Sequence, residues 1–405
     1  MKFKEFVTAT EQHWVDYLTR VDVLRQQGGL HTAGGTNLFP SLLLCTRSPR
    51  HFVAELVGAQ EEFQGLSVKK QRMASAEEYF GQFPAGRSDP ALRLTSARNG
   101  FINLTLSHDV AFEQVRDRFP FVTLYPTRLN RTGGHGSPIV FGSGFQSCMF
   151  DNCMILNHLG AVFRAKHILN AVVVSQGVAK RELEEWLEDV RRGNRVSGVH
   201  TCEPGAGVAL STAGQFSALY LSSSVRETTI GEFLRDHPRV LELAAGSLQF
   251  VYEPYLEWIE GPERNEDDAI NPDMLVQRPD HDWDIYDLKT ALLDRTTVTK
   301  GGRRRRRFVD KVEEGVAQLA NYREYFTYPA NQARAVEKYD AQVTDPRLVL
   351  VVGSLENVRE QEVREASRRL KDITLIDFDT LMQLFLMAAT RSGRAGGTES
   401  GISGA

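Results

Sequence analysis

Two short apolar segments with charged residues on a shared face most constrain how this chain can fold. The segments DMLVQ (273–277) and DWDIYDLK (282–289) are rich in β-forming residues, and the polar RPDHD separates them. This pattern predicts a β-hairpin. Because side chains alternate faces along a strand, Asp287 and Lys289 continue the apolar face of Trp283.

A third charged residue can join this pair. Asp273 shares a face with Leu275, and its distance along the chain from Asp287 is long enough for a turn that brings the two strands side by side. Asp282 and Asp284 fall on the opposite face, where we expect them to be solvated. A charge on an apolar face is costly unless it is paired or bound to a metal.

Two carboxylates and a lysine favour metal-dependent hydrolysis of phosphodiester bonds. Carboxylate oxygens are ligands of Mg²⁺, and a nearby lysine can orient an attacking water or neutralise developing charge. An Asp-x-Lys strand by itself more often marks a solvated charge ladder. The wider context therefore has to support the catalytic interpretation.

Composition indicates a globular protein without a bulk preference for nucleic acid. The 405 residues are 41% hydrophobic and the net charge is −4, so any affinity for nucleic acid must be local. Four scattered cysteines give no disulfide framework and suit a reducing compartment. With no signal-peptide pattern and no apolar run of membrane-spanning length, we expect a cytoplasmic protein that does not bind membranes.

The pattern of predicted elements changes near residue 225. Residues 1–224 predict a mixed α+β region that opens with an amphipathic helix over 1–26. Within this region, CMILNHLGAVFRAKHILNAVVVSQG predicts a buried helix followed by a strand at Asn170–Ser175. Its order of elements matches no family that we can name.

The second region, 225–390, reads as an α/β domain. A helix capped by Thr228 or Thr229 and ended by Gly246 precedes the hairpin, and a long helix begins near Phe308. The strands RLVLVVGS and TLIDFDTL follow, with a charged helix between them. The tail 391–405 has almost no large apolar residues, which predicts disorder.

These residues carry a resemblance to known nucleases. NPDMLVQ followed by WDIYDLK resembles the Pro-Asp…Asp/Glu-x-Lys signature of the PD-(D/E)XK nuclease superfamily. The arrangement of GEFLRDHPRVLEL, the two strands, VAQLANYREYF, RLVLVVGS and TLIDFDTL is similar to the nuclease domain of Shedu anti-phage defence proteins, over about residues 225–390.

The resemblance implies a fold, an activity and partners. We expect a restriction-endonuclease-like domain with a central mixed sheet flanked by helices. Its activity would be that of an Mg²⁺-dependent DNA endonuclease or nickase, with Mn²⁺ as a possible substitute, in anti-phage defence. The family also implies a homo-oligomer, a tetramer, in which residues 1–224 sense or regulate.

The resemblance assigns roles residue by residue. Asp273 matches the acid of the first motif, and Asp287 and Lys289 match the acid and lysine of the second. The two aspartates would hold the metal, and the lysine would assist the attacking water. Gln318, in the Gln-Leu-x-x-Tyr element, matches a residue that the family uses at its active site. Many relatives have Glu where this chain has Asp287.

The remaining family position is ambiguous in this sequence. The family's opening-helix glutamate corresponds best to Glu232, and Glu253 competes for the role. Glu232 has a structural alternative, because an acid early in a helix meets the helix dipole favourably. Gln318 could be an ordinary exposed helix residue, and Tyr322 fits packing better than chemistry.

A run of five arginines follows the Asp-x-Lys strand. In KGGRRRRRF, a flexible Gly-Gly entry precedes side chains that could grip DNA phosphates in a salt-dependent way, although such a run elsewhere is usually a solvated loop. The predicted phosphate-binding residues are Arg303, Arg304, Arg305, Arg306 and Arg307.

Several other functions fit the sequence less well. Cys148, Cys153, His158 and His167 have loose spacing and apolar neighbours, which favours core thiols over a zinc site. A non-catalytic DNA-binding protein with a degenerate nuclease fold, and a restriction or repair nuclease outside defence, remain the alternatives to the leading hypothesis.

Overall fold

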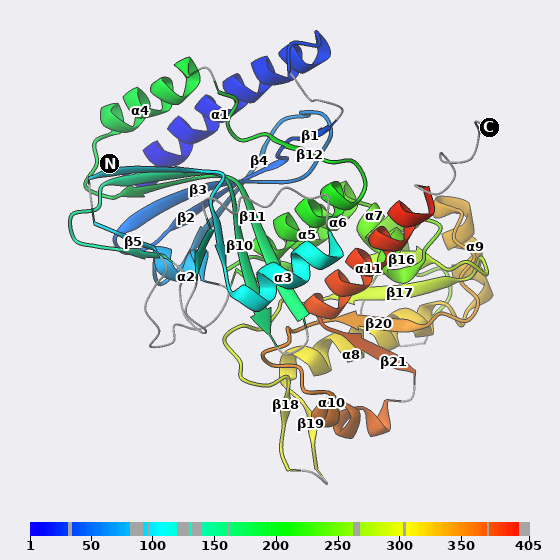
Figure 1. Cartoon of the computed structure of the whole chain (residues 1–405). Coiled ribbons are helices and arrows are strands. Elements are labelled where there is room, and N and C mark those ends of the chain that lie inside the picture. Colours follow the sequence, from blue (N-terminus) through cyan, green and yellow to red (C-terminus); the bar gives the residue numbers. More distant parts are fainter. Residues whose placement is uncertain are drawn as a thin grey trace, which may run out of the picture. The chain divides into compact units, whose positions relative to one another are not determined.

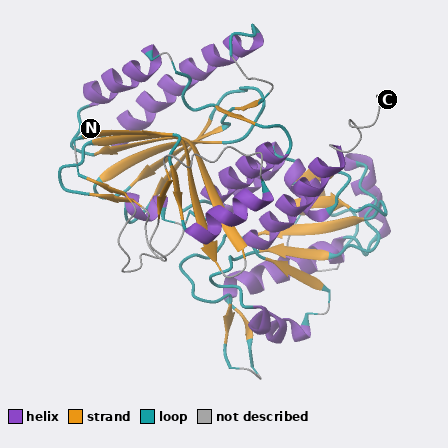
Figure 2. Cartoon of the chain, in the orientation of Figure 1, coloured by secondary structure: helices purple, strands orange, loops and turns teal. Residues whose placement is uncertain are grey.

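The chain forms two compact units in a computed structural model. The structure describes residues 1–30, 35–81, 92–95, 97–119, 129–131, 139–159, 162–193, 195–222, 224–261, 268–302, 305–370 and 372–396. One unit comprises Met1–Ser224 with the segment from Ala389 onward, and the other comprises Val225–Ala388. Both units contain helices and strands (Figure 2), which confirms the predicted α/β class. Within the described ranges, none of the helices combines the length and apolarity needed to cross a membrane.

The N-terminal unit is built on an eight-stranded sheet with helices against it (Figure 1). The strand order is β4-β2-β3-β11-β10-β7-β8, and β6 pairs with β10 off this path. The elements are α1 (Phe3–Gln26), β1 (Thr36–Leu38), β2 (Leu42–Arg47), β3 (His51–Val57), β4 (Ser67–Arg72), α2 (Ala76–Phe80), β5 (Leu92–Leu94), β6 (Arg98–Ile102), β7 (Thr105–Ser107), α3 (Asp109–Arg118), β8 (Leu129–Arg131), β9 (Ile139–Phe141), β10 (Ser147–Leu159), β11 (Val162–Ser175), α4 (Lys180–Arg192), β12 (His200–Cys202) and α5 (Ala206–Tyr220).

The centre of this sheet is a long antiparallel hairpin, where the sequence predicted a buried helix followed by a strand at Asn170–Ser175. The strand is confirmed as the end of β11, and the helix was wrong. Strands β10 and β11 pair from Ser147 with Val174 to Leu159 with Val162. Nearly every residue of both strands is buried, because helices cover the sheet. An apolar run that is buried on both faces loses the two-residue alternation of a half-exposed strand, and its period then resembles that of a buried helix.

Helices α1 and α4 share one core with this sheet. Phe6, Trp14 and Leu18 of α1 and Leu183 and Leu187 of α4 belong to the same buried cluster as residues of β2, β3 and β11. Apolar residues recur along α1 at helical spacing, as the sequence predicted for residues 1–26. The opening helix is therefore confirmed and is part of the core.

The C-terminal unit contains a five-stranded mixed sheet in the order β13-β16-β17-β20-β21. Strand β16 is antiparallel to its neighbours β13 and β17, and β17, β20 and β21 run parallel. The elements are α6 (Glu227–Asp236), α7 (Arg239–Ala245), β13 (Phe250–Tyr252), β14 (Leu256–Glu257), β15 (Ala269–Ile270), β16 (Met274–Gln277), β17 (Trp283–Leu288), β18 (Thr299–Lys300), β19 (Arg307–Phe308), α8 (Asp310–Tyr325), α9 (Pro329–Tyr339), β20 (Leu348–Val351), α10 (Glu360–Ala366), a 3₁₀ turn (Ser367–Arg369), β21 (Ile373–Ile376) and α11 (Phe378–Gly396).

The predicted hairpin is present as β16 and β17. Met274 pairs with Tyr286 and Gln277 with Trp283. The turn between the strands is held by Arg278, whose guanidinium lies 2.6 Å from the Asp284 carboxylate. Asp284 is buried through this contact, so the expectation that it is solvated was wrong. The arginine supplies the counter-charge that burial requires.

The helical segment before the hairpin differs in detail from the prediction. The sequence predicted one helix with a Thr228 or Thr229 cap, whereas α6 begins at Glu227 with Arg226 as its N-cap, and α7 follows as a separate helix. The break falls at Pro238, whose backbone has no N–H to continue the helix. Gly246 ends α7 with φ of 64°, a left-handed conformation that glycine adopts easily.

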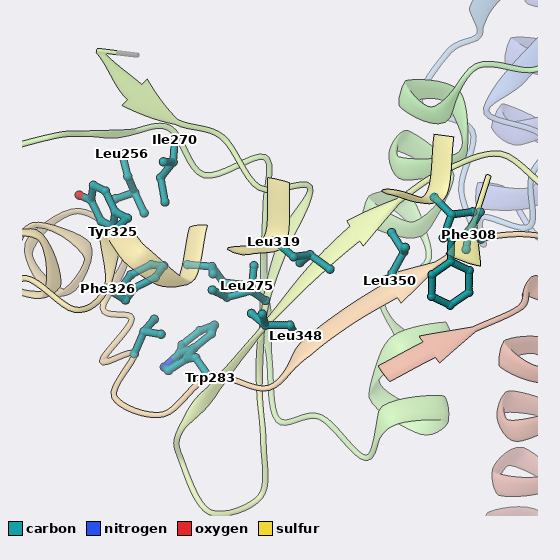
Figure 3. Close-up of a cluster of buried hydrophobic side chains, with 14 of the residues drawn as sticks. Leu256, Ile270, Leu275, Trp283, Phe308, Leu319, Tyr325, Phe326, Leu348 and Leu350 are labelled. Atoms are coloured by element: carbon teal, nitrogen blue, oxygen red, sulfur yellow. The ribbon is translucent and has the colours of Figure 1, made fainter. Parts of the chain in front are cut away.

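A single core joins the sheet to α8 (Figure 3). Leu275, Trp283 and Leu348 from the sheet meet Leu319 of α8 in this cluster. The opposite face of the sheet is also apolar and buried, and α6, α7 and α11 lie on that side (Figure 1). The strands are thus enclosed on both faces, and charged residues in them need local partners.

The end of the chain departs from the predicted disorder at 391–405. Helix α11 starts at Phe378 and runs to Gly396, beyond the predicted boundary. Leu381 and Phe385 anchor its first turns in the core, and the arginines and alanine that follow are good helix formers, so the helix continues. The last residues, 397–405, lie outside the described residues.

Candidate active site

The hairpin brings two of the predicted acids to one end of the sheet. Asp273 immediately precedes β16, and Asp287 is the penultimate residue of β17. The backbone N–H of Leu288 donates a hydrogen bond of 2.5 Å to Asp273 Oδ2. This bond fixes the first carboxylate against the strand that carries the second.

Lys289 links the second acid to the helix. Its Nζ lies 2.7 Å from Asp287 Oδ2 and donates a hydrogen bond of 2.8 Å to Gln318 Oε1 of α8. Its backbone N–H donates to the Val351 carbonyl, which extends the pairing with β20 by one residue. The structure therefore brings together all four residues that the nuclease resemblance selected first.

Burial shapes the electrostatics of this group. Asp287 is 2% exposed and Lys289 is 6% exposed. Burial raises the pKa of Asp287 to about 6, although the Lys289 ammonium opposes the shift. Burial and the charge of Asp287 raise the pKa of Asp273 to about 7. Burial also disfavours the charge on Lys289, but the Asp287 carboxylate outweighs this effect and raises the pKa of Lys289. One lysine therefore does not neutralise the two carboxylates, and a further cation would be attracted.

The donor set fits a divalent metal that keeps water or phosphate ligands. Asp287 Oδ2 is buried, and it lies 2.7 Å from the Lys289 ammonium. Among the described residues, no three His, Cys, Asp or Glu side chains form a complete metal-binding group. Mg²⁺ is commonly held by one or two carboxylates together with substrate phosphates, so Asp273 and Asp287 suffice for such a site.

A glycine of α8 allows the helix to approach the acids. A Cβ added to Gly315 would lie 3.1 Å from Asp287 Oδ2, 3.2 Å from Lys289 Cε and 2.7 Å from Leu350 Cδ1. Any side chain here would displace the carboxylate or the helix. The sequence signal was present, because an isolated glycine inside a helical pattern often marks close packing.

A glutamate that sequence reasoning did not select lies within electrostatic reach of the site. The charge of Glu227, the first residue of α6, raises the pKa of Asp273, Asp287 and Lys289 alike. The spacing of Glu227 from the motif residues in the sequence does not predict this proximity, because the position of Glu227 depends on how α6 packs on the sheet.

The two glutamates that the sequence did suggest have other surroundings. The charge of Glu232 acts on Arg235 and Tyr252. Glu253 is exposed and accepts a hydrogen bond of 3.1 Å from the Tyr252 hydroxyl. Glu227 is therefore a better candidate than either for a third acid.

Tyr322 supports the site indirectly. Its hydroxyl donates a hydrogen bond of 3.3 Å to the Asn271 carbonyl, two residues before Asp273. The ring also packs at the edge of the core. These contacts agree with the packing role expected for it.

Arg305 and Arg306 lie in the connection of the small hairpin β18–β19, which Figure 1 shows extending from this unit, and Arg307 begins β19. Arg305 and Arg307 are exposed. Arg306 instead lies 3.2 Å from Glu362 and 3.0 Å from Glu365 of α10, so it fastens the hairpin to that helix. Arg303 and Arg304 lie outside the described residues.

The cysteines have the core environment that the sequence suggested. Cys148 and Cys153 are buried in β10, opposite Val173 and Ile168 of β11. Burial raises the pKa of the Cys153 thiol to about 12. All four cysteines of the chain are free.

A comparison with known protein families found a match in the C-terminal unit. Residues 224–382 match the family described as Shedu protein SduA, C-terminal. The match covers the hairpin, α8 and the strands β20 and β21, and it leaves the N-terminal unit outside. A search of curated proteins found no match for the chain.

Proposed function

From the premise that residues 224–382 belong to the Shedu C-terminal family, we propose that this unit is a metal-dependent DNA endonuclease or nickase. The Shedu domain implies a role in anti-phage defence. The observation that carries the enzymatic proposal is the contact of Lys289 with both Asp287 and Gln318 beside Asp273.

Each side chain has a role that its contacts allow. Asp273 and Asp287 would hold Mg²⁺, with Mn²⁺ as a substitute, and the ion would polarise the phosphate and lower the pKa of a bound water. Lys289, fixed by Asp287 and Gln318, would orient the attacking water and stabilise negative charge developing on the phosphate. Gln318 positions the ammonium and leaves the lysine free to donate its other protons.

DNA would reach this site along the β18–β19 hairpin. Arg305 and Arg307 are exposed and carry the positive charge that phosphates attract. The pairing of Arg306 with Glu362 and Glu365 would hold the hairpin in place while its neighbours bind.

The family resemblance and the free cysteines support a proposal for the oligomeric state and the location of the enzyme. We expect a homo-oligomer, a tetramer, in which the N-terminal unit senses the trigger and restrains cleavage. Four free cysteines suit a reducing compartment, so the proposed location is the cytoplasm.

Cleavage of supercoiled and linear plasmid tests this proposal. The full chain should nick or cut DNA in Mg²⁺ and leave it intact in EDTA. Asp287→Asn should lower the rate by about 10³-fold, because it removes a metal ligand without changing the size of the side chain.

An aspartate in the loop that follows β17 serves as the control. Asp294→Asn alters an exposed carboxylate and should leave the rate unchanged. If the full chain cuts equally well in EDTA, or if Asp287→Asn retains full activity, the proposed metal site is wrong. If the chain binds DNA without cutting it under any metal condition, the binding-only alternative replaces the proposal.

A further inference from the structure

The strand that carries Lys289 ends in a reversal of the backbone. The Lys289 N–H donates to the Val351 carbonyl, and the Thr290 carbonyl accepts a hydrogen bond of 3.1 Å from the Gly353 N–H. Two residues after Thr290, the backbone of Leu292 has φ of 49°. Bulky side chains rarely occupy this left-handed region, and such a conformation persists only where neighbouring groups hold it.

Asn357 is the side chain that holds this reversal. It is 0% exposed. Its Nδ2 donates hydrogen bonds of 2.8 Å to the Ala291 carbonyl and of 2.8 Å to the Leu292 carbonyl. Its Oδ1 accepts a hydrogen bond of 2.9 Å from the Ser354 N–H, which fixes the direction of the amide. Both amide protons are therefore used on the two residues at which the chain turns.

A glycine makes room for the Asn357 amide. Gly353, two residues after the end of β20, has φ of 83°. A Cβ added to it would lie 2.8 Å from Asn357 Oδ1 and 2.6 Å from Val358 Cγ2. The N–H of the same glycine bonds to Thr290, so the position that admits the amide also extends the sheet past Lys289.

The main chain of Asn357 reaches the element that follows. Its carbonyl accepts a hydrogen bond of 3.0 Å from the Val298 N–H, directly before β18. One residue therefore holds both ends of the segment that leaves the Asp287–Lys289 strand. The chain then continues through the β18–β19 hairpin into α8, which carries Gln318. Asn357 thus binds the start of the connection between the two elements that meet at the Lys289 ammonium.

We propose that Asn357 is a positioning residue for Lys289, an inference that rests on the proposed nuclease function. Asp287 and Gln318 hold the ammonium, and the reversal at Leu292 holds the backbone that carries it. Loss of the amide would release the reversal and let the backbone of Lys289 move. A displacement of about 1 Å in a reacting group costs about 10²-fold in rate.

The variant Asn357→Asp tests this role in the full chain. Aspartate has nearly the same shape, but its ionised side chain only accepts hydrogen bonds and would face two carbonyl oxygens. In Mg²⁺-dependent plasmid cleavage, kcat per folded molecule should fall about 10²-fold, because Lys289 is misplaced. KM for DNA should change less than about threefold, because Arg305 and Arg307 are unaltered. A merely structural role would lower the folded fraction and leave kcat per folded molecule unchanged.

Asn331 offers a matched control in the same unit. It is also 0% exposed, and its Nδ2 donates to the Glu260 carbonyl at 2.7 Å and to the Tyr325 carbonyl at 3.0 Å. These partners lie in the loop after β14 and at the last residue of α8. Asn331→Asp should therefore destabilise the fold and leave kcat per folded molecule unchanged. An equal fall of kcat in both variants would overturn the specific role of Asn357.

Hydrogen exchange in EDTA observes the reversal without requiring activity. In Asn357→Asp, the amides of Lys289, Arg295 and Gly353 should exchange about tenfold faster, because their acceptors lie in or beside the released turn. In Asn331→Asp these amides should keep the unmodified rate. If Asn357→Asp does not fold, Asn357→Ser takes its place, since its hydroxyl can donate one of the two bonds and should lower kcat about tenfold.

The outcomes separate this inference from the proposed function. An unmodified chain that does not cut DNA would overturn the nuclease proposal and the role of Asn357 with it. If the unmodified chain cuts, two results would overturn the role of Asn357 alone. They are an unmodified kcat in a folded Asn357 variant and unchanged exchange at Lys289.

Discussion

The two units each contain a buried pair of an acid and a lysine, and the pairs differ in what surrounds them. In the N-terminal unit, Lys166 Nζ lies 3.6 Å from Glu55 Oε2. Tyr79 closes this pair, because its hydroxyl donates to Glu55 and its carbonyl accepts a hydrogen bond of 3.1 Å from Lys166. The Lys166 ammonium also lies 4.5 Å from the centre of the Tyr79 ring.

The pair in the C-terminal unit is left open on the acid side. Asp287 and Lys289 have the half-buried Asp273 beside them as a second carboxylate. Burial of an ion pair is therefore not the mark of a catalytic site, since both pairs are buried. What distinguishes the candidate site is that two carboxylates, Asp273 and Asp287, share one lysine and that Asp273 is partly accessible.

The first expected difference concerns how closely α8 must approach the pair of Asp287 and Lys289. Gly315→Ala should lower the cleavage rate by about 10²-fold, because the new methyl group displaces Asp287 and such misplacements of reacting groups carry costs of this size. The measurement is plasmid cleavage in Mg²⁺. Gly302→Ala adds a methyl group to open space and is the control. Equal rates for the two variants would remove Gly315 from the account.

The two pairs should also respond oppositely to loss of the acid. Glu55→Gln leaves Lys166 buried without its counter-charge, which should lower the free energy of unfolding by about 3–5 kcal/mol. Asp287→Asn removes an under-neutralised charge and should leave stability unchanged or raise it when the metal is chelated. Chemical denaturation in EDTA at pH 8 measures both. A large loss of stability in Asp287→Asn would mean that its pair is structural too.

The stability of the open pair should depend on pH. Folding raises the pKa of Asp273 to about 7 and of Asp287 to about 6 from 3.8, so the folded state binds these protons more tightly than the unfolded state. Their contribution to stability is therefore present at low pH and is lost as pH rises from about 4 to 7.

Thermal unfolding in EDTA should show this loss between pH 5 and pH 8. The double variant Asp273→Asn/Asp287→Asn should lose less over the same range, and Mg²⁺ should raise the Tm of the unmodified chain more at pH 8 than at pH 5. An identical pH profile in the double variant would contradict the assigned shifts.

The smallest effect is expected at the arginine hairpin. Arg305→Ala should reduce the slope of log K against log salt concentration by about one, where K is the DNA association constant, because the variant loses about one phosphate contact. Arg306 differs because it pairs with Glu362 and Glu365, so Arg306→Ala should loosen the hairpin from α10. Fluorescence anisotropy with duplex DNA over a salt series, in EDTA, separates the two. A salt dependence unchanged in Arg305→Ala would exclude that arginine from phosphate binding.

The residues of the candidate site differ in how far the sequence could predict their positions. Asp273, Asp287 and Lys289 were found because they lie in or directly beside two adjacent strands, where the two-residue alternation determines which side chains share a face. Gln318 was found only through the family resemblance. Glu227 was missed because its place depends on packing between α6 and the sheet, which no local pattern records.

In the N-terminal unit, the opening helix was predicted correctly, but the helix predicted before Asn170 was wrong for a physical reason. Strands β10 and β11 are buried on both faces, so their sequence does not alternate and it resembled a helix. Glu55 and Lys166 are far apart in the sequence and meet only through the pairing of β3 with β11. Tyr79 reaches them from α2, and no local sequence pattern indicates this contact.

The most direct test of the account compares the two lysines under one assay. Lys289→Met and Lys166→Met each remove a buried ammonium, and both are measured for Mg²⁺-dependent plasmid cleavage, normalised to the folded fraction. The account predicts that Lys289→Met lowers cleavage by about 10³-fold while remaining folded, and that Lys166→Met lowers Tm but cuts at the unmodified rate per folded molecule. Cleavage that persists in folded Lys289→Met would contradict the assignment of the open pair as the active site.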